Sequence, residues 1–467
     1  MGGGAGDLPA AASAVDPAAA GPAAASAPGA GSWLPQSLRW RRTSTAEADT
    51  AERGMLGLLR SRVAARSVPV GPGPQDYLRT LEVEPPGGDA APAPGKAAAA
   101  ATDASAAAAA ASGDGARLPV VLLPGYGAGA AFWWRNIDGL AAAPGLRLFA
   151  VDWLGTGRSG RPPFSARGHA EAEAFFVDSL AAWRAAEGLE GRKMVLVGHS
   201  LGGYLAAAYA LRHPDHVQHL VLVCPAGVPE KPEGWESRFS SPAVPALRRA
   251  LFRAAAGAWE AGVTPGAVIR ALGPWGPGLV GKYVGGRFSY HGQPLTAEEV
   301  PVFSDYFYHI SASAGSGEFA LRHLLSPGAW ARSPLRRRLL GLPPAGEGGP
   351  GPAPAAADAA APAAAAAAAA TDAAAPAAAA AAAGPGAAAA PPAAFPPVSF
   401  IYGEHDWMDP RNAVALAAEL DKARPRAVPS DHDVQIIPDS GHYVMVEQPA
   451  AFNETLLRLL APWLPRG

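Results

Sequence analysis

The sequence predicts an α/β fold in which a mostly parallel sheet carries helices on both faces. Strand-length and helix-length segments alternate, as in the strand of 146–163 that runs into a glycine loop, the helix of 172–189 and the strand of 194–197. These strands are apolar throughout and do not alternate apolar with polar residues, which is typical of strands buried on both faces. Apolar strands that alternate with helices indicate a parallel sheet between two helical layers.

The remaining elements follow in the order that such a fold requires. A helix is expected from about Thr45, with Thr43 or Ser44 as its N-cap, inside an N-terminal helical segment over 33–80. The other expected elements are a strand in 117–127, a helix after Gly203, a strand in 217–229, a strand in 397–402, a strand at 434–438 and a helix in 452–464.

The alternation stops between 230 and 340, where aromatic residues and proline are frequent, and short helices and loops are expected to form a lid. The globular core is therefore expected in 117–229 and 397–464. Alanine and proline dominate the tracts 1–32, 87–116 and 341–396, which show no hydrophobic periodicity. We predict that these three tracts are disordered or semi-helical insertions, because repeated proline and glycine cut the polyalanine into short pieces.

Composition and charge exclude several classes of protein. A net charge of -2 over 467 residues gives no reason to expect a nucleic-acid partner. The single cysteine, Cys224, forbids an internal disulfide and suits a reducing compartment, and because it follows "HLVLV" we expect a buried thiol at a strand end. No run of bulky apolar residues is long enough to span a membrane, and the first 32 residues lack the Lys or Arg of a signal peptide. A cytoplasmic protein is expected.

The stretch "MVLVGHSLGGYLAAAYALR" places Ser200 between a strand and a helix. Gly198-His199-Ser200-Leu201-Gly202 has the G-x-S-x-G form of the nucleophile elbow, in which a strained turn exposes the serine and the glycines let strand and helix approach closely. A chance match is the alternative, since five loosely constrained positions recur often. The strand before it and the helix after it favour the elbow.

A serine hydroxyl needs a base, and the base needs an orienting acid. Asp406 follows the strand of 397–402 and His442 follows the strand at 434–438, so serine, acid and histidine come in the order that this fold uses. Asp409 is the rival acid, further from the strand end. His199 and His405 are expected to make local hydrogen bonds.

An oxyanion that develops on the substrate needs two backbone N–H groups. We expect one from Leu201, directly after the nucleophile, and one from Tyr126, in the glycine-rich turn that ends the strand of 117–127.

The segment Gly155-Thr156-Gly157-Arg158-Ser159-Gly160 fits the dinucleotide pattern G-x-G-x-x-G. A dinucleotide site requires a helix at the third glycine, and Pro162 and Pro163 argue against one. We therefore expect a tight loop, with no nucleotide cofactor, and no cluster of residues has convincing metal-ligand spacing.

Five segments carry a resemblance to one family: 151–164, 176–189, 198–229, 306–335 in the lid, and 441–453. On these segments the chain resembles the α/β-hydrolases that include the animal lipid-droplet lipase coactivator and its plant and algal lysophosphatidate acyltransferase relatives. The coactivator has Asn at the nucleophile position, where this chain has Ser200. The family's acyltransferase motif is His, four residues, Asp, and here His442 is followed at that spacing by Glu447. Glu447 either positions His442 or an acceptor, or is a solvated residue at the start of the last helix.

The resemblance implies an α/β-hydrolase fold and a serine-dependent lipid ester hydrolase or lysophosphatidic acid acyltransferase. Its substrates would be phospholipid, lysophospholipid or acylglycerol, acyl-CoA is a candidate donor, and the protein would lie at the surface of lipid droplets or membranes. Trp33 and Trp40, with neighbouring arginines, are candidates for lipid contact, and a helix packed on the domain is the alternative. Two other functions remain open: a non-catalytic lipase scaffold, or a soluble carboxylesterase for small molecules.

Overall fold

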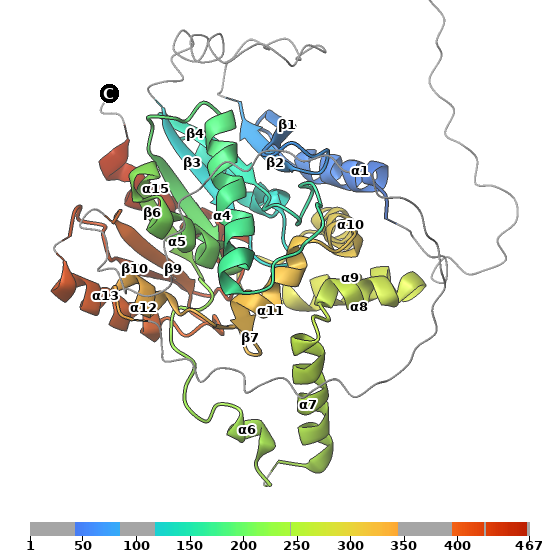
Figure 1. Cartoon of the computed structure of the whole chain (residues 1–467). Helices are drawn as coiled ribbons and strands as arrows, with labels where there is room; N and C mark the ends of the chain where they lie inside the picture. The colour runs from blue at the N-terminus through green and yellow to red at the C-terminus, as the bar shows by residue number, and fades with distance from the viewer. Residues whose placement is uncertain (1–42, 85–116, 243, 344–394, 425, 465–467) are drawn as a thin grey trace, which may run out of the picture. The chain divides into compact units, whose positions relative to one another are not determined.

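An eight-stranded sheet runs through the part of the chain that the structure describes (Figure 1). This computed structural model describes residues 43–84, 117–242, 244–343, 395–424 and 426–464. The strand order is β1-β2-β4-β3-β5-β6-β9-β10, and the six strands from β4 to β10 are parallel, as the sequence predicts. The strands are β1 (Val63–Pro69), β2 (Tyr77–Val83), β3 (Leu118–Leu123), β4 (Leu146–Val151), β5 (Met194–His199), β6 (Val217–Val223), β9 (Val398–Gly403) and β10 (Val434–Ile437).

Helices cover the sheet in two groups. Helix α4 packs against α5, which lies in front of the strands in Figure 1, and α3 packs against α15. Burial on both faces explains why β3 and β5 are apolar throughout, since no residue from Val120 to Leu123 or from Met194 to Val197 is exposed. The helices that flank the sheet are α3 (Trp134–Ala141), α4 (His169–Ala186), α5 (Leu201–Arg212), α13 (Arg411–Ala423), α14 (Val444–Glu447) and α15 (Pro449–Leu460).

The N-terminal segment is only partly helical. Helix α1 (Thr45–Leu56) begins as expected, because the Ser44 hydroxyl accepts a hydrogen bond from the Glu47 N–H at 3.2 Å. The expectation of a helical segment over all of 33–80 is wrong, since 63–69 and 77–83 form β1 and β2, which pair antiparallel at the edge of the sheet.

Charged residues hide these two strands in the sequence. Arg66 on β1, Glu82 on β2 and Arg147 on β4 form ion pairs of 2.6 Å and 2.9 Å across three neighbouring strands. Such cross-strand pairs replace the apolar run that marks the central strands.

Some predicted segments lie outside the described residues. They are the alanine-rich tracts of 1–32 and 87–116, nearly all of 341–396, and the candidate lipid contacts Trp33 and Trp40.

The predicted lid lies between β6 and β9 and consists of short helices with one small hairpin. Helix α10 packs against α1 and α9, and its Phe303 and Tyr306 are buried against Phe132, with ring centroids 4.8 Å and 6.2 Å apart. None of the helices among the described residues is both long enough and apolar enough to cross a membrane. The lid elements are α6 (Ser237–Ser240), α7 (Ala246–Glu260), α8 (Pro265–Ala271), α9 (Gly276–Arg287), α10 (Glu299–Ala312), α11 (Leu321–Leu324), β7 (Leu325–Ser326), β8 (Trp330–Ala331) and α12 (Leu335–Leu339).

Candidate active site

Ser200 occupies a strained turn between β5 and α5. Its backbone has φ 53° and ψ -120°, a left-handed conformation that a residue with a side chain rarely adopts. The glycines around it have no room for a side chain, because a Cβ on Gly198 would lie 2.6 Å from the Gly202 carbonyl oxygen and one on Gly202 would clash with the Pro124 carbonyl. The elbow geometry therefore holds the Ser200 side chain clear of both the strand and the helix.

The structure brings Ser200, His442 and Asp406 together in one line of contacts. The Ser200 Oγ lies 3.0 Å from His442 Nε2, and His442 Nδ1 lies 2.9 Å from Asp406 Oδ1. Asp406 follows β9 and His442 follows β10, and parallel strands bring both loops to the same edge of the sheet as Ser200. This arrangement allows His442 to take the serine proton while Asp406 orients the imidazole.

The rival acid, Asp409, is bound to Arg411, whereas His442 is bound to Asp406. Its carboxylate pairs with Arg411 at 2.6 Å near the surface, and the hydrogen bonds from Arg411 lower the Asp409 pKa. Asp406, in contrast, has a side chain with no solvent exposure.

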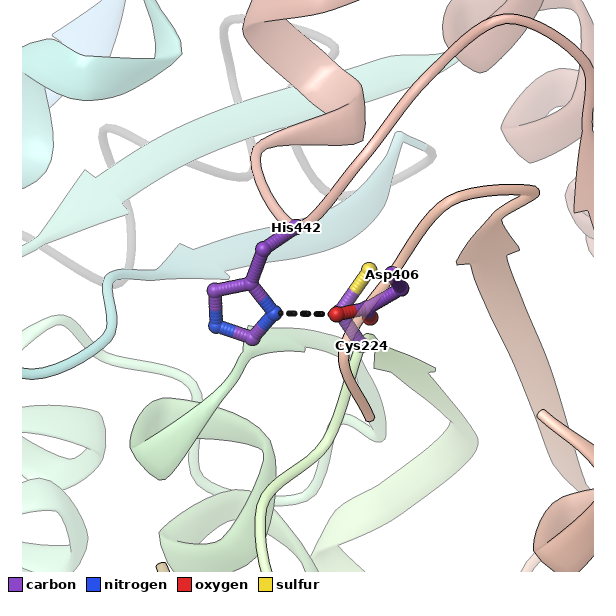
Figure 2. Close-up of side chains that lie close together, drawn as sticks. All are labelled: Cys224, Asp406 and His442. Carbon is purple, nitrogen blue, oxygen red and sulfur yellow. Dashed lines mark hydrogen bonds and ion pairs between the residues drawn. The ribbon is translucent and has the colours of Figure 1, made fainter. Parts of the chain in front are cut away.

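Cys224 lies beside the Asp406 carboxylate (Figure 2). Oδ1 accepts a hydrogen bond from the Met408 N–H at 3.0 Å, whereas Oδ2 finds no conventional donor among the described residues. Burial, followed by the negative charge of Asp406, raises the pKa of the Cys224 thiol well above its usual value. The thiol is therefore protonated and can act as a weak donor toward the Asp406 carboxylate. Cys224 is a buried thiol after β6, as predicted.

Leu201 and Tyr126, the two residues expected to supply the oxyanion N–H groups, lie close to the nucleophile in the structure. Leu201 is the first residue of α5, so its N–H has no partner within the helix. A Cβ on Gly125, the residue before Tyr126, would lie 3.0 Å from the Cβ of Ser200, so this turn packs against the serine. Both amides belong to residues that line the same cavity, as an oxyanion hole requires.

His199 holds the loop that carries His442. It is fully buried, and its Nε2 lies 2.8 Å from the His442 carbonyl oxygen. Burial, and then the positive charge that His442 can carry, lower the His199 pKa well below its usual value. A neutral His199 thus donates a local hydrogen bond, as expected for it.

Glu447 is not the solvated residue that was one alternative for it. Its side chain is 1% exposed, one oxygen pairs with Arg287 at 2.8 Å, and the other accepts the N–H of Gly441, next to His442. Both carboxylate oxygens are therefore used to join the lid helix α9 to the loop of His442.

Asp152, a residue with no role predicted above, orders the loop of 155–160. Its carboxylate accepts the N–H groups of Ala130 at 2.6 Å and Arg158 at 2.7 Å. Burial raises the Asp152 pKa to about 7. The loop is a tight turn with positive φ at Gly155 and Gly157, as expected, and α4 begins only at His169.

A cavity of about 700 Å³ opens over Ser200 and His442. Its volume suits a lipid-sized ligand. The lid supplies most of its apolar wall, and Trp407 and Met408 close it on the side of the Asp406 loop. Apolar lid residues that line it are Trp259, Val268, Ile269, Leu279, Val280, Phe307, Ile310, Leu321 and Leu325.

Two groups of side chains in the described segments bring possible metal-donor atoms within 4.8 Å of one another. The first is Cys224, Asp406 and His442, where a protonated thiol is a poor ligand. The second is His291, His405 and Asp439, where the two imidazole rings stack with centroids 4.7 Å apart. We assign no metal to either group.

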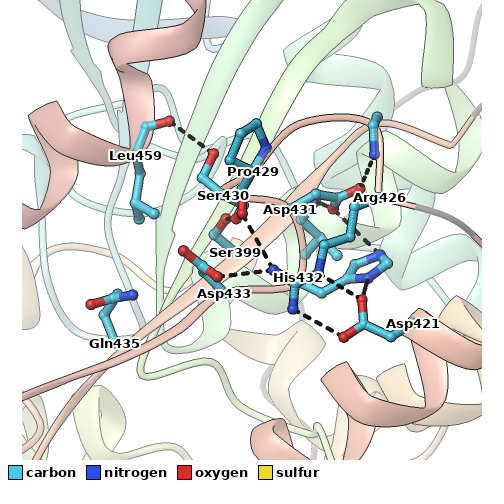
Figure 3. A network of polar contacts seen from close by, with 12 residues as sticks. Ser399, Asp421, Arg426, Pro429, Ser430, Asp431, His432, Asp433, Gln435 and Leu459 are labelled. Atoms are coloured by element: carbon cyan, nitrogen blue, oxygen red, sulfur yellow. Dashed lines mark hydrogen bonds and ion pairs between the residues drawn. The ribbon is translucent and has the colours of Figure 1, made fainter.

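A second pair of histidine and aspartate lies at the turn between α13 and β10 (Figure 3). His432 Nδ1 is 2.8 Å from Asp421 Oδ1, and Arg426 donates to both oxygens of Asp421, at 2.9 Å and 3.0 Å. The His432 N–H donates to the Val398 carbonyl at 2.6 Å, so this turn is fixed to the start of β9.

Comparisons with known proteins agree with this architecture. A family model of the α/β hydrolase fold matches residues 119–261. A probable 1-acylglycerol-3-phosphate O-acyltransferase of Oryza sativa subsp. japonica is 32% identical over 94% of this chain and 87% of its own length. The 1-acylglycerol-3-phosphate O-acyltransferase of Arabidopsis thaliana is 33% identical over 91% of this chain and 82% of its own length. The (lyso)-N-acylphosphatidylethanolamine lipase of Homo sapiens is 39% identical, over 48% of this chain and 60% of its own length.

Proposed function

Because this chain belongs to the α/β-hydrolase family that includes the plant 1-acylglycerol-3-phosphate O-acyltransferases, we propose that it is a serine-dependent lipid ester hydrolase or acyltransferase. The observation that carries the proposal is the line of Ser200, His442 and Asp406 at the floor of an apolar cavity of about 700 Å³. The proposed substrates are phospholipids, lysophospholipids or acylglycerols, met at a lipid-droplet or membrane surface. A small-molecule carboxylesterase would not need so large an apolar wall.

In the first half of the reaction, Ser200 Oγ attacks the carbonyl carbon of an acyl ester while His442 Nε2 takes the hydroxyl proton. The carbonyl oxygen becomes an oxyanion between the N–H groups of Leu201 and Tyr126. His442 then protonates the leaving alcohol, and the acyl group stays on Ser200. The lid residues hold the acyl chain.

In the second half, an acceptor hydroxyl approaches the acyl-Ser200. His442 removes its proton, the acyl group moves to the acceptor oxygen, and the proton returns to Ser200 Oγ. Water as acceptor gives a free fatty acid, and a lysolipid hydroxyl gives an acylated lipid. Acyl-CoA as the donor of the acyl group stays a prediction.

Glu447 acts in this scheme as a positioning residue, because both of its oxygens are already bound to Gly441 and Arg287. It fixes the backbone next to His442 and does not reach an acceptor. Its longer side chain, compared with the Asp of the family motif, therefore affects hydrolysis and acyl transfer alike.

The test is covalent labelling with a fluorophosphonate, followed by product analysis. The probe should label Ser200 in the folded wild type and leave Ser200→Ala unlabelled, because only an activated serine beside an oxyanion hole attacks phosphorus at a useful rate. Purified protein incubated with phospholipid alone, and separately with lysophosphatidate and acyl-CoA, then shows which acceptor is used. A folded wild type that takes up no probe and releases no fatty acid would leave a non-catalytic lipase scaffold as the better function.

A further inference from the structure

Two arginines line the described part of the cavity, and they differ in what their guanidinium groups contact. Arg161 donates from Nη1 to the carbonyls of Gly155 and Ala314, and from Nη2 to those of Gly157 and Ile310, at 2.8–3.3 Å. Burial lowers its pKa. The Nη1 and Nη2 groups of Arg161 thus already bind backbone carbonyls, and they hold the loop of 155–160 against the lid.

Arg287, at the end of α9, keeps donors free. Its Nη1 donates to Glu447 Oε1 at 2.8 Å, and no other acceptor among the described residues takes a hydrogen bond from it. The guanidinium carbon lies 5.2 Å from the centre of the Tyr443 ring, and the side chain is 23% exposed. Since a guanidinium has five N–H donors, the Nε and Nη2 groups remain available to a ligand.

The position of this guanidinium is fixed relative to the reacting groups. Glu447, which anchors Arg287, also binds the N–H of Gly441, the residue before His442. Tyr443, under the guanidinium, follows His442 directly, and their ring centroids are 5.7 Å apart. A ligand bound to Arg287 therefore lies beside His442, in a cavity whose wall is mostly apolar.

We propose that Arg287 is a binding site for the phosphate group of a lysophosphatidate, a role that rests on the lipid-ester function proposed above. Arginine recognises phosphate through paired N–H···O bonds, and a buried carboxylate that holds one end of the guanidinium presents the other end in a set orientation. In a lysophosphatidate the free hydroxyl and the phosphate sit on neighbouring carbons of the glycerol. Phosphate on Arg287 thus brings that hydroxyl toward His442, and the same contact selects phosphorylated over neutral glycerolipids.

The experiment measures binding without turnover, in a Ser200→Ala background. Lysophosphatidate and a monoacylglycerol with the same acyl chain are titrated in neutral detergent micelles, with and without Arg287→Gln. Loss of the charge-assisted bonds should weaken lysophosphatidate binding by about 10- to 100-fold and change monoacylglycerol binding far less, so the preference ratio falls. Lys282→Gln, an exposed cation on the same helix, is the matched control and should leave the ratio unchanged.

A second variant separates binding from damage to the loop. Arg287→Gln leaves the buried Glu447 carboxylate without its partner, whereas Arg287→Gln/Glu447→Gln does not. The double variant should regain part of the turnover of monoacylglycerol, measured with Ser200 restored, and still lack the preference for lysophosphatidate.

An equal loss of affinity for both lipids in Arg287→Gln, or a preference that survives the substitution, overturns the phosphate site. Inhibition by free inorganic phosphate or by CoA alone, with no preference between the two lipids, would also overturn it. Failure of the catalytic proposal looks different, since the wild type would then turn over neither lipid while the binding ratio still reports on Arg287.

Discussion

Among the described residues, two pairs of histidine and aspartate have nearly the same short contact, and only one of these two pairs faces a nucleophile. His442 and Asp406 are 2.9 Å apart, and His432 and Asp421 are 2.8 Å apart. The free nitrogen of His442 lies 3.0 Å from Ser200 Oγ at the floor of the cavity, whereas His432 Nε2 lies 3.4 Å from a second carboxylate, that of Asp431. The contact between imidazole and carboxylate therefore does not by itself define a catalytic pair.

The partners of the two carboxylates also differ. Arg426 donates to both oxygens of Asp421, so much of the negative charge of this aspartate is already neutralised. Apart from His442, Asp406 is bound among the described residues by one backbone N–H, that of Met408, and lies beside the neutral Cys224 thiol. Its full charge is available to stabilise a His442 imidazolium, which is what base catalysis requires. The first pair is arranged for proton transfer, and the second for holding a turn.

The largest difference should appear when each histidine is replaced by alanine and ester hydrolysis is measured. His442→Ala removes the base that activates Ser200, and we expect kcat/KM to fall by about 10,000-fold or more. The same assay on His432→Ala should show wild-type kcat per folded molecule. Comparable activity in the two variants would remove His442 from the mechanism.

Stability should respond in the opposite order. His432→Ala leaves Asp421 and Asp431 facing a void at the turn between α13 and β10, and we expect it to lower the free energy of unfolding by about 2 kcal/mol. Thermal unfolding followed by circular dichroism measures this. His442→Ala, which vacates a place at the edge of a cavity, should cost less, and a larger loss of stability in His442→Ala would contradict the division of roles.

A smaller effect should follow from the thiol beside the catalytic acid. Cys224→Ala removes the weak donor beside the Asp406 carboxylate, and we expect kcat to fall roughly 3- to 10-fold, the worth of one weak hydrogen bond. Cys224→Ser keeps a donor of similar size and should retain most of the activity. The pH profile of kcat separates this role from packing, because a change in how well the Asp406 carboxylate stabilises the His442 imidazolium moves the acid limb of the profile. Equal losses in the alanine and serine variants, with an unmoved pH profile, would show that Cys224 only fills space.

The smallest effect should be the pH dependence that Asp421 contributes to stability. Hydrogen bonds from Arg426 and His432 lower the Asp421 pKa to about 2, below the ordinary value of about 3.9. A carboxylate with a lowered pKa in the folded state stabilises the fold above the ordinary value, and this stabilisation is lost as the pH falls from about 4 to about 2. Because the Asp421 side chain is 35% exposed, solvent screens the effect.

The comparison for this last prediction is between wild type and Asp421→Asn, melted at a series of pH values and constant ionic strength. The difference in melting temperature should be greatest near neutral pH and should shrink below pH 4 or so. A difference that does not change with pH would mean that the turn depends on the shape of Asp421 and not on its charge.

Local patterns in the sequence anticipated most of the sheet and the side chains that meet at its edge. Ser200, Asp406 and His442 each follow a recognisable apolar strand, and the carboxyl ends of parallel strands share one edge, so their order was enough to predict that they meet. The edge strands β1 and β2 were missed, because Arg66 and Glu82 break the apolar signal and stabilise the strands only through partners on neighbouring strands.

Contacts between distant segments left no local trace. Arg287 and Glu447 are separated by 160 positions, and no sequence pattern around either residue predicts that the two form an ion pair. The same is true of Cys224, whose neighbour Asp406 comes from a strand that the sequence reaches only after the lid. The role of Asp152 was predictable from the sequence. A single carboxylate directly after a buried strand needs hydrogen-bond donors, and the loop that follows the strand is the nearest source of them.

The strands that bound the lid, β6 and β9, are direct neighbours in the sheet, with Leu220 paired to Val398. The chain thus leaves the sheet and rejoins it at adjacent positions, and the register of the strands is set without reference to the length or content of what lies between. Exchange of this segment between relatives is therefore a route by which the protein could acquire a new lipid preference while Ser200, Asp406 and His442 keep their places. Arg287 travels with the exchanged segment, and its partner Glu447 stays behind with the sheet. A lid from a relative would function best where it also brings a cation to the Glu447 carboxylate. This ion pair is therefore the contact that an exchanged lid must keep with the sheet that carries the catalytic residues.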